Sequence, residues 1–384
     1  MEITFVASNY PTEKKQVHVF LDNVVRKFTD LGITCNVIAP QSWYSCLRNR
    51  KFARSAISQR RTEKGNVYTV YSPRYTVFPI VKLGKLCLAD FSKKSFYRAL
   101  KRTYRKYNFK SDVIYAHFIQ AGVPAVMLAE YLKLPSFIAN GEADTIGESA
   151  SLSHNLVKNT LEKVTGIISV STKNKDEIVS LYGSEEILKK VRIIVNSADS
   201  KLFYKKDKLA CRQKFGFPEN AFIIAYTGSF IKRKGTRLLS SALERFDDVY
   251  SIFIGVGEDK PTCKNILHTG RVNNKELADY LNAADMFVLP TLAEGCCNAI
   301  VEAVSCGLPV VSSDRAFNHD ILDESCAILI DPTDEDAIYQ AIKRMKEDET
   351  YRESLANGSM EKAKSLSLDV RVEKLLSFIS DMKN

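Results

Sequence analysis

Residues 284–313 constrain the fold more than any other part of the chain, because they predict one complete strand–helix–strand unit. Residues 284–289 form an apolar run that is typical of a buried strand. A helix of about two to three turns is predicted to end at Gly307, with Pro309 just beyond it. Residues 310–313 predict a second strand. Such a unit favours a parallel sheet covered by helices.

The same alternation is predicted along most of the chain. Further strands are expected at residues 3–7, 34–40, 112–118, 136–139, 166–171, 191–196, 221–226, 250–255, 266–272 and 327–332. Helices are expected at residues 17–31, 91–107, 121–132, 154–164, 175–182, 236–246, 274–283, 334–345 and 369–382, with Asn274 and Asp334 as caps. We therefore predict two α/β domains with a cleft between them, residues 1–203 and 204–365. The helix within residues 366–384 is expected to cross back to the first domain.

Residues 41–85 have a weaker pattern. Within them, residues 67–71 and 75–80 are candidate short strands. No chemical motif is recognisable here, so we interpret the stretch as a lid, an acceptor surface or a membrane contact.

Length and composition exclude several classes of protein. A chain of 384 residues predicts two domains, and no apolar run approaches the ~20 residues that span a bilayer. The first residues read as a strand and lack the basic start and apolar stretch of a signal peptide. The nine cysteines include no Cys-x-x-Cys motif, which indicates buried, reduced thiols and a cytoplasmic protein. The adjacent Cys296 and Cys297 could form a metal or redox pair, but no His or Cys partner stands at ligand spacing.

Positive charge is concentrated in the first part of the chain. Residues 1–110 hold 22 Lys and Arg against 6 Asp and Glu, a net charge of +16, whereas the whole chain carries +10, leaving −6 for residues 111–384. The basic residues are interleaved with aromatic and aliphatic ones, a pattern that fits an anionic membrane surface. A solvated basic surface and a nucleic-acid interface are the alternatives, and no nucleic-acid-reading motif is recognised.

Two glutamates frame the loop and helix after the strand at 284–289. Glu294 follows the carboxyl end of that strand, where ligands bind in open α/β sheets. Asn298, Glu302 and Ser305 recur at helical spacing and predict a polar stripe opposite the apolar face of the helix. For such a pair alone, a loop charge and a solvated helix face are the simpler interpretation. The strand, glycine-containing loop and helix around it favour a ligand site.

A second candidate site is the turn from Gly228 to Gly235, between a predicted strand and a predicted helix. It contains three consecutive cations, Lys232, Arg233 and Lys234. Glycines let a ligand approach the backbone, and a helix N-terminus favours an anion. The turn therefore predicts a diphosphate site, with a basic surface turn as the alternative.

Together these stretches resemble the motifs of retaining glycosyltransferases of the GT-B fold, glycosyltransferase family 4. Residues 291–309 resemble the glutamate motif of that family, and residues 228–235 resemble its Gly-Arg-Leu-x-x-x-Lys-Gly element. Residues 112–118 resemble the family's strand ending in His, and residues 140–144 resemble its His-Gly-x-x-Asp segment. Residues 191–203 resemble its Pro-Asn-Gly-Val-Asp hinge element. The resemblance implies an α/β fold of the GT-B type, with two Rossmann-like domains facing across a cleft.

Some positions depart from the family pattern. Ser229 stands where the family has Arg, so that Arg233 or Lys232 would supply the second charge on the diphosphate. The other departures are Lys15-Gln16 for Gly-Gly, Asn140 for His, and Val195 and Ser197 for the Pro and Gly of the hinge.

The resemblance implies that a hexosyltransferase-type enzyme moves a sugar from a nucleoside diphosphate sugar with retention of configuration. Its catalytic residues would be Lys234, which stabilises the diphosphate, Glu294, which binds the sugar near the anomeric carbon, and His117, which touches the donor sugar. The donor-binding set would be Gly228, Ser229, Arg233, Val272, Gly295, Cys296, Cys297, Asn298 and Glu302. Glu302 would accept hydrogen bonds from the ribose. Neither a metal, a cofactor nor a protein base is expected.

The expected partners follow from the same resemblance and from the charge. We expect a nucleotide-sugar donor, a lipid-linked or free saccharide acceptor in polysaccharide biosynthesis, and a peripheral position on the inner face of the cell membrane, without nucleic acid. The alternatives are a nucleotide-sugar epimerase or a phosphorylase on the same fold, and an inactive relative that binds lipid or nucleic acid.

Overall fold

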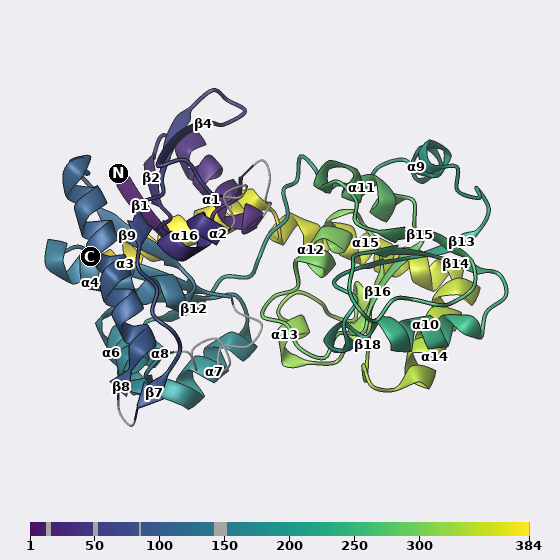
Figure 1. Ribbon diagram of the computed structural model, residues 1–384. Helices are drawn as coiled ribbons and strands as arrows, with labels where there is room; N and C mark the ends of the chain where they lie inside the picture. Colours follow the sequence, from purple (N-terminus) through teal and green to yellow (C-terminus); the bar gives the residue numbers. More distant parts are fainter. Residues whose placement is uncertain (13–16, 49–52, 84–85, 142–151, 384) are drawn as a thin grey trace. The chain divides into compact units, whose positions relative to one another are not determined.

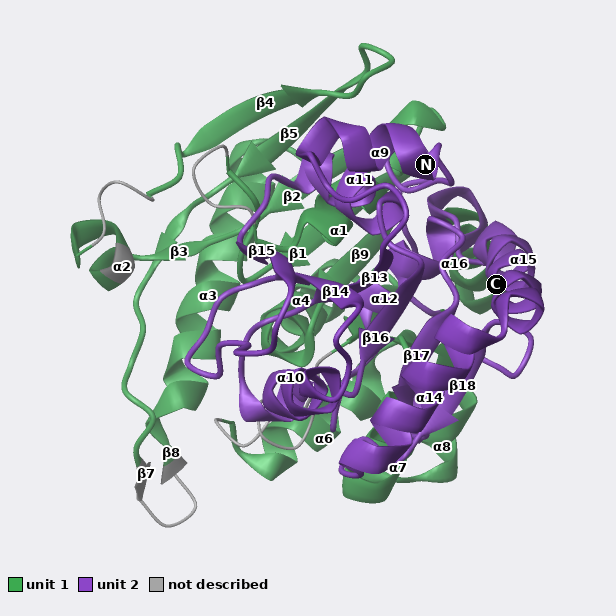
Figure 2. Ribbon diagram, turned by 90° about the vertical axis from the view of Figure 1, so that its right-hand side faces the viewer, with its two compact units in different colours: residues 1–194, 372–384 green, residues 195–371 purple. Residues whose placement is uncertain are grey.

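The computed structural model divides the chain into two compact units, each of which is described by itself. Unit 1 comprises residues 1–194 and 372–384, and unit 2 comprises residues 195–371 (Figure 2). The structure describes residues 1–12, 17–48, 53–83, 86–141 and 152–383. Lys15-Gln16 and residues 142–144 of the Asn-Gly-Glu-Ala-Asp segment lie outside them. The boundary between the units follows Ile194, nine residues before the one expected from the sequence.

Unit 1 is built on an eight-stranded sheet in the order β12-β11-β10-β9-β1-β2-β5-β4. Its strands are β1 (Glu2–Ala7), β2 (Thr34–Ile38), β4 (Ile57–Arg61), β5 (Val67–Tyr71), β9 (Val113–His117), β10 (Ser136–Asn140), β11 (Gly166–Ser169) and β12 (Val191–Ile193). All neighbours pair in parallel except β4 and β5, which form an antiparallel hairpin. The central strands β9 and β10 are buried along their whole length, as expected where helices cover a parallel sheet.

The helices of unit 1 pack on both faces of this sheet. They are α1 (Val19–Asp30), α2 (Trp43–Arg48), α3 (Leu88–Lys106), α4 (Ile119–Leu132), α6 (His154–Lys163), α7 (Thr172–Tyr182) and α8 (Glu185–Lys189). Helix α4 contacts β9, β10, α3 and α6, whereas α1 contacts β2 and β5. The last helix, α16 (Leu368–Lys383), belongs to unit 1 from Val372 onward, and its Phe378 ring lies 5.6 Å from that of Phe137.

The prediction of a strand at residues 75–80 was wrong. Only Tyr75 pairs, in the short β6 (Arg74–Tyr75) beside β3 (Gln41–Ser42), and residues 76–80 are exposed. Their apolar side chains lie on the surface, and Pro79 has no N–H for a ladder. Another two-stranded pair, β7 (Lys82–Leu83) and β8 (Leu86–Cys87), precedes α3. The hairpin partner β4 and helix α2 were not predicted.

Unit 2 is built on a six-stranded, all-parallel sheet in the order β15-β14-β13-β16-β17-β18. Its strands are β13 (Phe222–Thr227), β14 (Val249–Ile254), β15 (Ile266–Gly270), β16 (Met286–Leu289), β17 (Val310–Ser313) and β18 (Ala327–Ile330). The strand order reverses at the β13–β16 pair, which creates a topological switch point there. The largely parallel sheet of unit 1 and the all-parallel sheet of unit 2 confirm the predicted α/β fold class.

The helices of unit 2 form two layers around its sheet (Figure 1). They are α9 (Lys208–Phe215), the 3₁₀ turn η2 (Lys232–Lys234), α10 (Thr236–Glu244), α11 (Asn274–Asn282), α12 (Asn298–Ser305), α13 (Ala316–His319), α14 (Glu335–Glu347) and α15 (Glu349–Ser365). Helices α10 and α14 pack together on one face, while α12 packs on α15, and α9 on α11, on the other face (Figure 1).

Local sequence signals explain where the helices of unit 2 begin and end. The Asp334 side chain accepts from the amides of Asp336 and Ala337 and caps α14, as predicted. The cap of α11 is Asn273, whose side chain accepts from the Lys275 amide, so the prediction of Asn274 was wrong by one residue. Gly307, with φ 72°, follows the end of α12 as predicted.

Candidate active site

Two loops of unit 2 meet beyond the carboxyl ends of β13 and β16. These strands are neighbours in the sheet, so the turn after β13 and the loop after β16 leave it side by side. The Arg233 carbonyl accepts from the Leu292 amide at 2.7 Å and from Thr291 Oγ1 at 3.3 Å, which ties the loops together. This is the switch point of the sheet, where ligands bind in such folds.

The close contact of the two loops requires a glycine at position 235. Gly235 has φ 70°, in the left-handed region, and a Cβ atom there would lie 2.2 Å from the Pro290 carbonyl oxygen. The glycine lets η2 turn into α10 while its backbone touches the end of β16. The two cations that precede it, Arg233 and Lys234, are thereby placed beside the loop that carries Glu294.

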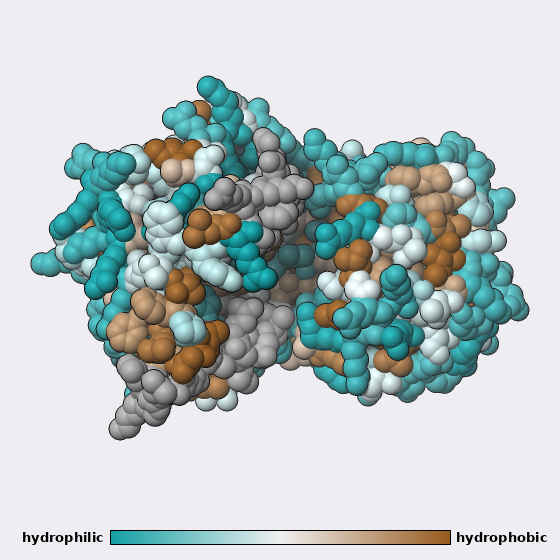
Figure 3. Space-filling view, in the orientation of Figure 1, coloured by the Kyte–Doolittle hydropathy of each residue, from teal (hydrophilic) through white to brown (hydrophobic). Residues whose placement is uncertain are grey.

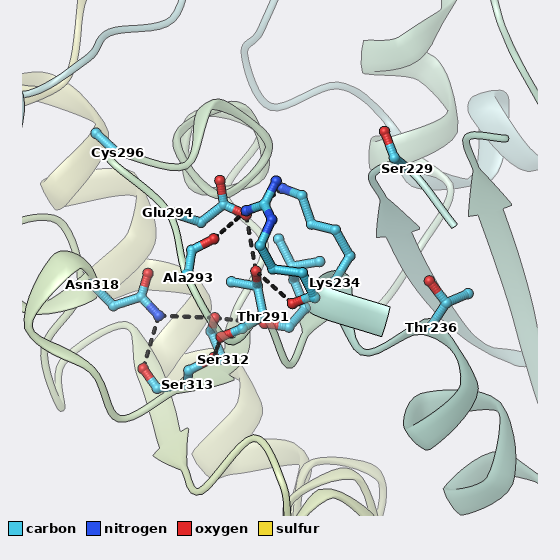
Figure 4. A network of polar contacts seen from close by, with 12 residues as sticks. Ser229, Lys234, Thr236, Thr291, Ala293, Glu294, Cys296, Ser312, Ser313 and Asn318 are labelled. Carbon is cyan, nitrogen blue, oxygen red and sulfur yellow. Dashed lines mark hydrogen bonds and ion pairs between the residues drawn. The ribbon is translucent and has the colours of Figure 1, made fainter. Parts of the chain in front are cut away.

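One carboxylate oxygen of the buried Glu294 contacts both cations of this site (Figure 4). Oε1 of Glu294 lies 2.5 Å from Lys234 Nζ and 3.1 Å from Arg233 Nη1, and it accepts from Thr291 Oγ1 at 2.9 Å. Arg233 Nη1 also donates to the Ala293 carbonyl. Glu294 is only 8% exposed. Oε2 accepts no hydrogen bond from the described residues, so one oxygen of this carboxylate is available to a ligand.

Buried hydroxyl and amide groups support the loop after β16 from the neighbouring strand. Ser313 Oγ, at the end of β17, donates to the Thr291 carbonyl, and Asn318 Nδ2 donates to the Ser313 carbonyl at 2.8 Å and to Ser312 Oγ at 3.1 Å (Figure 4). These residues were missing from the predicted set. Polar residues directly after two apolar strands, Thr291 and the pair Ser312-Ser313, were the signal that could have identified them.

The ionisation states of the site follow from burial and neighbouring charge. Burial alone would lower the pKa of Lys234, but the adjacent Cys297 and Glu294 raise it above its usual value. Burial raises the pKa of the Cys296 thiol to about 12 and that of the Cys297 thiol to about 11. Lys234 is therefore a cation at neutral pH and both thiols are protonated, which leaves the backbone amides as the polar groups of this loop.

Asn196 holds the same loop at its other end. Its amide donates to Cys296 Sγ at 3.3 Å, and its Nδ2 donates to the Cys296 carbonyl at 3.2 Å and to Asn298 Oδ1 at 2.9 Å. Asn298 is exposed at the start of α12. Asn196 therefore positions the residues that precede the helix.

Glu302 lies one turn further along α12 and is not part of the Lys234–Glu294 cluster. Its side chain is half-buried, and burial raises the pKa of its carboxyl to about 8. Within the described residues this carboxyl forms neither a hydrogen bond nor an ion pair. An acceptor without a protein partner is suited to binding a hydroxyl pair of a ligand.

The remaining predicted donor-binding residues are Gly228, Ser229, Val272 and Gly295, and no side chain among them binds Glu294 in the described structure. Gly228 lies beside the Lys234 side chain, because a Cβ atom there would be 3.6 Å from Lys234 Cδ. Ser229 is exposed and lies apart from the network (Figure 4). Val272 is half-buried after β15, and Gly295 is buried beside Glu294.

His117 and Asn140 end two neighbouring strands of unit 1. His117 is 5% exposed and packs against Phe118 and Phe20, with ring centroids 4.2 and 4.9 Å away. Phe118 has φ 68° and ψ 152°, a strained conformation for a residue with a side chain. Asn140 is fully buried at the end of β10. The histidine therefore lies at a strained strand end, a common feature of functional sites.

Neither a metal cluster nor a membrane-spanning helix occurs in the part of the chain that the structure describes. Its His, Cys, Asp and Glu side chains form no group of three or more that is placed to hold a metal ion. None of its helices is both long enough and apolar enough to cross a membrane.

The two α/β units have the GT-B fold of the solved structures that this chain superposes on. More particularly, residues 221–348, which contain the Lys234–Glu294 cluster and Glu302, match the family described as glycosyl transferases group 1. The chain is thus a glycosyl-transferring enzyme, as the resemblance implied.

Similar proteins agree with this class. A Bacillus subtilis protein named as a putative glycosyltransferase of teichuronic acid biosynthesis, TuaC, is 26% identical over 93% of this chain and 92% of its own. The Escherichia coli UDP-Gal:alpha-D-GlcNAc-diphosphoundecaprenol alpha-1,3-galactosyltransferase is 24% identical over 75% of this chain and 78% of its own. HepE of Anabaena, solved with UDP, superposes with a TM-score of 0.76 at 14% identity, covering 99% of this chain and 100% of its own.

Proposed function

We propose that the protein is a retaining glycosyltransferase of family 4, which moves a sugar from a nucleoside diphosphate sugar to an acceptor hydroxyl. The observation that carries the proposal is the pairing of Lys234 with Glu294 at the carboxyl ends of β13 and β16. One of the GT-B proteins with a similar fold, HepE, was solved with UDP-glucose, which supports a nucleotide-sugar donor here.

The donor diphosphate would bind at the turn after β13. As the glycosidic bond breaks, negative charge develops on the leaving diphosphate. Lys234, Arg233, the backbone amides of residues 295–298 and the N-terminus of α12 are placed to stabilise that charge. These groups carry the positive charge that a metal ion would otherwise supply, so we propose transfer without a metal.

The two glutamates would act on different parts of the donor. Oε2 of Glu294 is available to bind sugar hydroxyls and to balance positive charge on the anomeric carbon. Glu302 would accept hydrogen bonds from the ribose hydroxyls. The leaving phosphate oxygen would take the proton of the acceptor hydroxyl on the same face of the sugar, which retains the configuration without a protein base. The role of His117, on unit 1, stays a prediction.

We propose a lipid-linked saccharide as the acceptor. The name of the Escherichia coli galactosyltransferase gives its acceptor as a sugar linked to diphosphoundecaprenol, and TuaC is named for teichuronic acid biosynthesis. These relatives support an acceptor that is anchored in a membrane, and therefore an enzyme that works at the inner face of the cell membrane.

The surface of unit 1 supports such a peripheral position. Apolar side chains gather near the β7–β8 end of α3 (Figure 3), where Val77, Phe78, Ile80, Val81 and Phe91 are all exposed. The rings of Phe78 and Phe91 lie 6.1 Å apart, so the segment 76–81 packs beside the start of α3. Exposed Lys94, Arg98 and Arg102 continue along the same helix. Apolar side chains beside cations suit the interface of an anionic membrane.

A thermal-shift screen with UDP-, GDP- and ADP-sugars identifies the donor, because a bound ligand raises the melting temperature by mass action. The stabilising donor is then incubated with the enzyme, with and without acceptor, and the products are separated. Transfer or slow hydrolysis supports the proposal. Interconversion of free nucleotide sugars without acceptor would identify an epimerase instead.

Flotation with phosphatidylglycerol vesicles tests the membrane position separately. We expect the protein to float at low salt, and Phe78→Ser with Ile80→Ser to reduce the floated fraction. A protein that stays at the bottom of the gradient at low salt contradicts this part of the proposal.

A further inference from the structure

Unit 1 contains a pocket of about 460 Å³ that the proposed chemistry does not use. It is formed by Gln41 after β2, by residues 71–76 at the end of β5 and by the face of α3 around Arg102. It therefore lies at the carboxyl ends of two parallel strands. Among the described residues, its lining includes Arg54, Arg74, Arg102 and Lys106 but neither Asp nor Glu.

In the described part of the chain, only neutral groups hold Arg54 in this pocket. Its Nη2 donates to the carbonyls of Ala39 and Pro40 at 2.9 and 3.0 Å, and its Nε donates to Ser72 Oγ at 3.2 Å. The two N–H groups of Nη1 have no acceptor among the described residues. Burial lowers the pKa of Arg54 below its usual value. A partly buried guanidinium without a carboxylate is costly unless an anion compensates it.

The other three cations of the pocket also lack a carboxylate partner among the residues that the structure describes. Arg74 stacks on the ring of Trp43, with the guanidinium carbon 4.5 Å from the centroid, and Lys106 lies 5.2 Å from the ring of Tyr107. Within the described residues, neither these two nor Arg102 forms an ion pair. Four positive charges therefore surround one cavity whose apolar walls are Trp43, Tyr71, Tyr75 and Tyr107.

We propose that this pocket binds the phosphate or diphosphate group of the acceptor, with the aromatic rings against the adjoining sugar. The inference rests on the proposed function and names its acceptor class as a phosphorylated saccharide. Guanidinium groups recognise phosphate oxygens through paired hydrogen bonds, and Arg54 is already fixed with Nη1 available. An anion with several oxygens would also satisfy Arg74, Arg102 and Lys106 together.

The chain offers a local reporter, because Trp43 is its only tryptophan. Titrating the full-length protein with inorganic pyrophosphate should change the Trp43 fluorescence in a saturable way. Arg54→Gln and Arg102→Gln should each weaken this binding by about tenfold or more, the loss expected for a charged hydrogen bond. Arg102 is exposed and makes no hydrogen bond among the described residues, so its variant tests the pocket even if Arg54→Gln fails to fold.

Two control variants make the titration specific. Arg61→Gln removes an exposed arginine of β4 that does not line the pocket, and it should change the affinity less than about twofold. Lys234→Ala weakens the donor site in unit 2 and should leave the Trp43 signal intact. Binding that is absent, or that falls equally with Arg61→Gln, overturns the proposal.

The phosphate could belong to an acceptor or to a membrane lipid, and a second experiment with lipid vesicles distinguishes these two sources. Phosphatidylglycerol vesicles are added to the wild type and to Arg54→Gln. If the vesicles change the Trp43 fluorescence only in the wild type, and pyrophosphate neither changes the fluorescence nor competes with the vesicles, the pocket binds lipid headgroups and the acceptor assignment is wrong. In transfer assays, Arg102→Gln should raise the KM for the acceptor more than the KM for the donor. If the wild-type enzyme shows neither transfer nor hydrolysis of the donor, that result would instead count against the proposed function.

Discussion

The Nζ atom of Lys234 lies 2.5 Å from Oε1 of Glu294, and this contact joins residues that are sixty positions apart in the sequence. Before any ligand binds, the two charges neutralise each other in a largely buried place. A donor diphosphate that approaches Lys234 meets a cation already fixed in position, and the sugar meets a carboxylate with Oε2 available. Because the groups are oriented in advance, little reorganisation accompanies the reaction.

Lys234→Met should reduce kcat for sugar transfer by roughly 10²–10³-fold, the loss typical of one preorganised charge-stabilising group. The measurement is the initial rate of transfer from the donor found in the thermal-shift screen. Lys232→Met is the matched control, since Lys232 is exposed on the same 3₁₀ turn. It should retain at least about half of the activity. Equal losses in both variants would show that the turn acts through its total charge alone.

The sequence predicted much of this site because strand ends can be read from it. Lys234 and Glu294 each follow an apolar run, and parallel strands bring their carboxyl ends to one edge of the sheet. It did not decide between Arg233 and Lys232 as the second cation, because that depends on the left-handed turn at Gly235. Arg233 contacts Glu294, whereas the Lys232 side chain is exposed.

The parts that were missed depend on contacts between residues of different secondary-structure elements. The hydrogen bonds of Asn318 run from helix α13 to Ser312 and Ser313 at the end of β17, which no periodicity reveals. The strands β3 and β6 have two residues each and exist only because residues 41–42 pair with residues 74–75. Hydrophobic spacing cannot predict elements of that length.

Glu302 should make the stability of the protein fall as the pH rises. Its carboxyl has a pKa of about 8 in the folded protein against 4.5 as a free group, because burial disfavours the charged form. A proton bound more tightly in the folded state stabilises that state at low pH, and this stabilisation is lost between about pH 4.5 and pH 8. Urea denaturation of the wild type and of Glu302→Gln across this range measures the effect.

The slope attributable to Glu302 should lie below the limit of about 1.4 kcal/mol per pH unit for one group. Part of the side chain reaches solvent, which reduces the burial penalty. Donor affinity should change in the opposite direction, since the ionised carboxylate is the better acceptor for ribose hydroxyls. The KM for the donor should fall as the pH rises through about 8 in the wild type. A parallel decrease in Glu302→Gln would assign it to another group.

Cys297→Ala should leave the rate of transfer within about threefold of the wild type, since the protonated thiol carries no charge and the backbone amide is unchanged. Its pKa of about 11 also predicts slow alkylation by iodoacetamide at neutral pH. Removing a fully buried side chain should cost about 1–2 kcal/mol in the free energy of unfolding. Rapid alkylation with loss of activity would instead show that the thiol takes part in the reaction.

Gly235→Ala should destabilise the protein more than Gly216→Ala, although both glycines have nearly the same backbone conformation. Gly216 ends α9 with φ 67°, and no atom lies within 4 Å of the position that a Cβ would occupy there. Its alanine variant therefore meets only the left-handed penalty of about 1–2 kcal/mol. At Gly235, with φ 70°, the methyl group would also collide with the Pro290 carbonyl oxygen. That overlap adds about 1–3 kcal/mol.

The Gly235 variant should lose function as well as stability. To relieve the collision, η2 must move away from the end of β16, and Lys234 and Arg233 then separate from Glu294. We therefore expect transfer to fall at least about tenfold for Gly235→Ala at a temperature where the variant is still folded, and to stay near the wild-type rate for Gly216→Ala. Denaturant unfolding and initial rates on the same samples separate the two effects. If Gly235→Ala matches Gly216→Ala in both measurements, the close approach of the two loops does not set the position of the charged cluster.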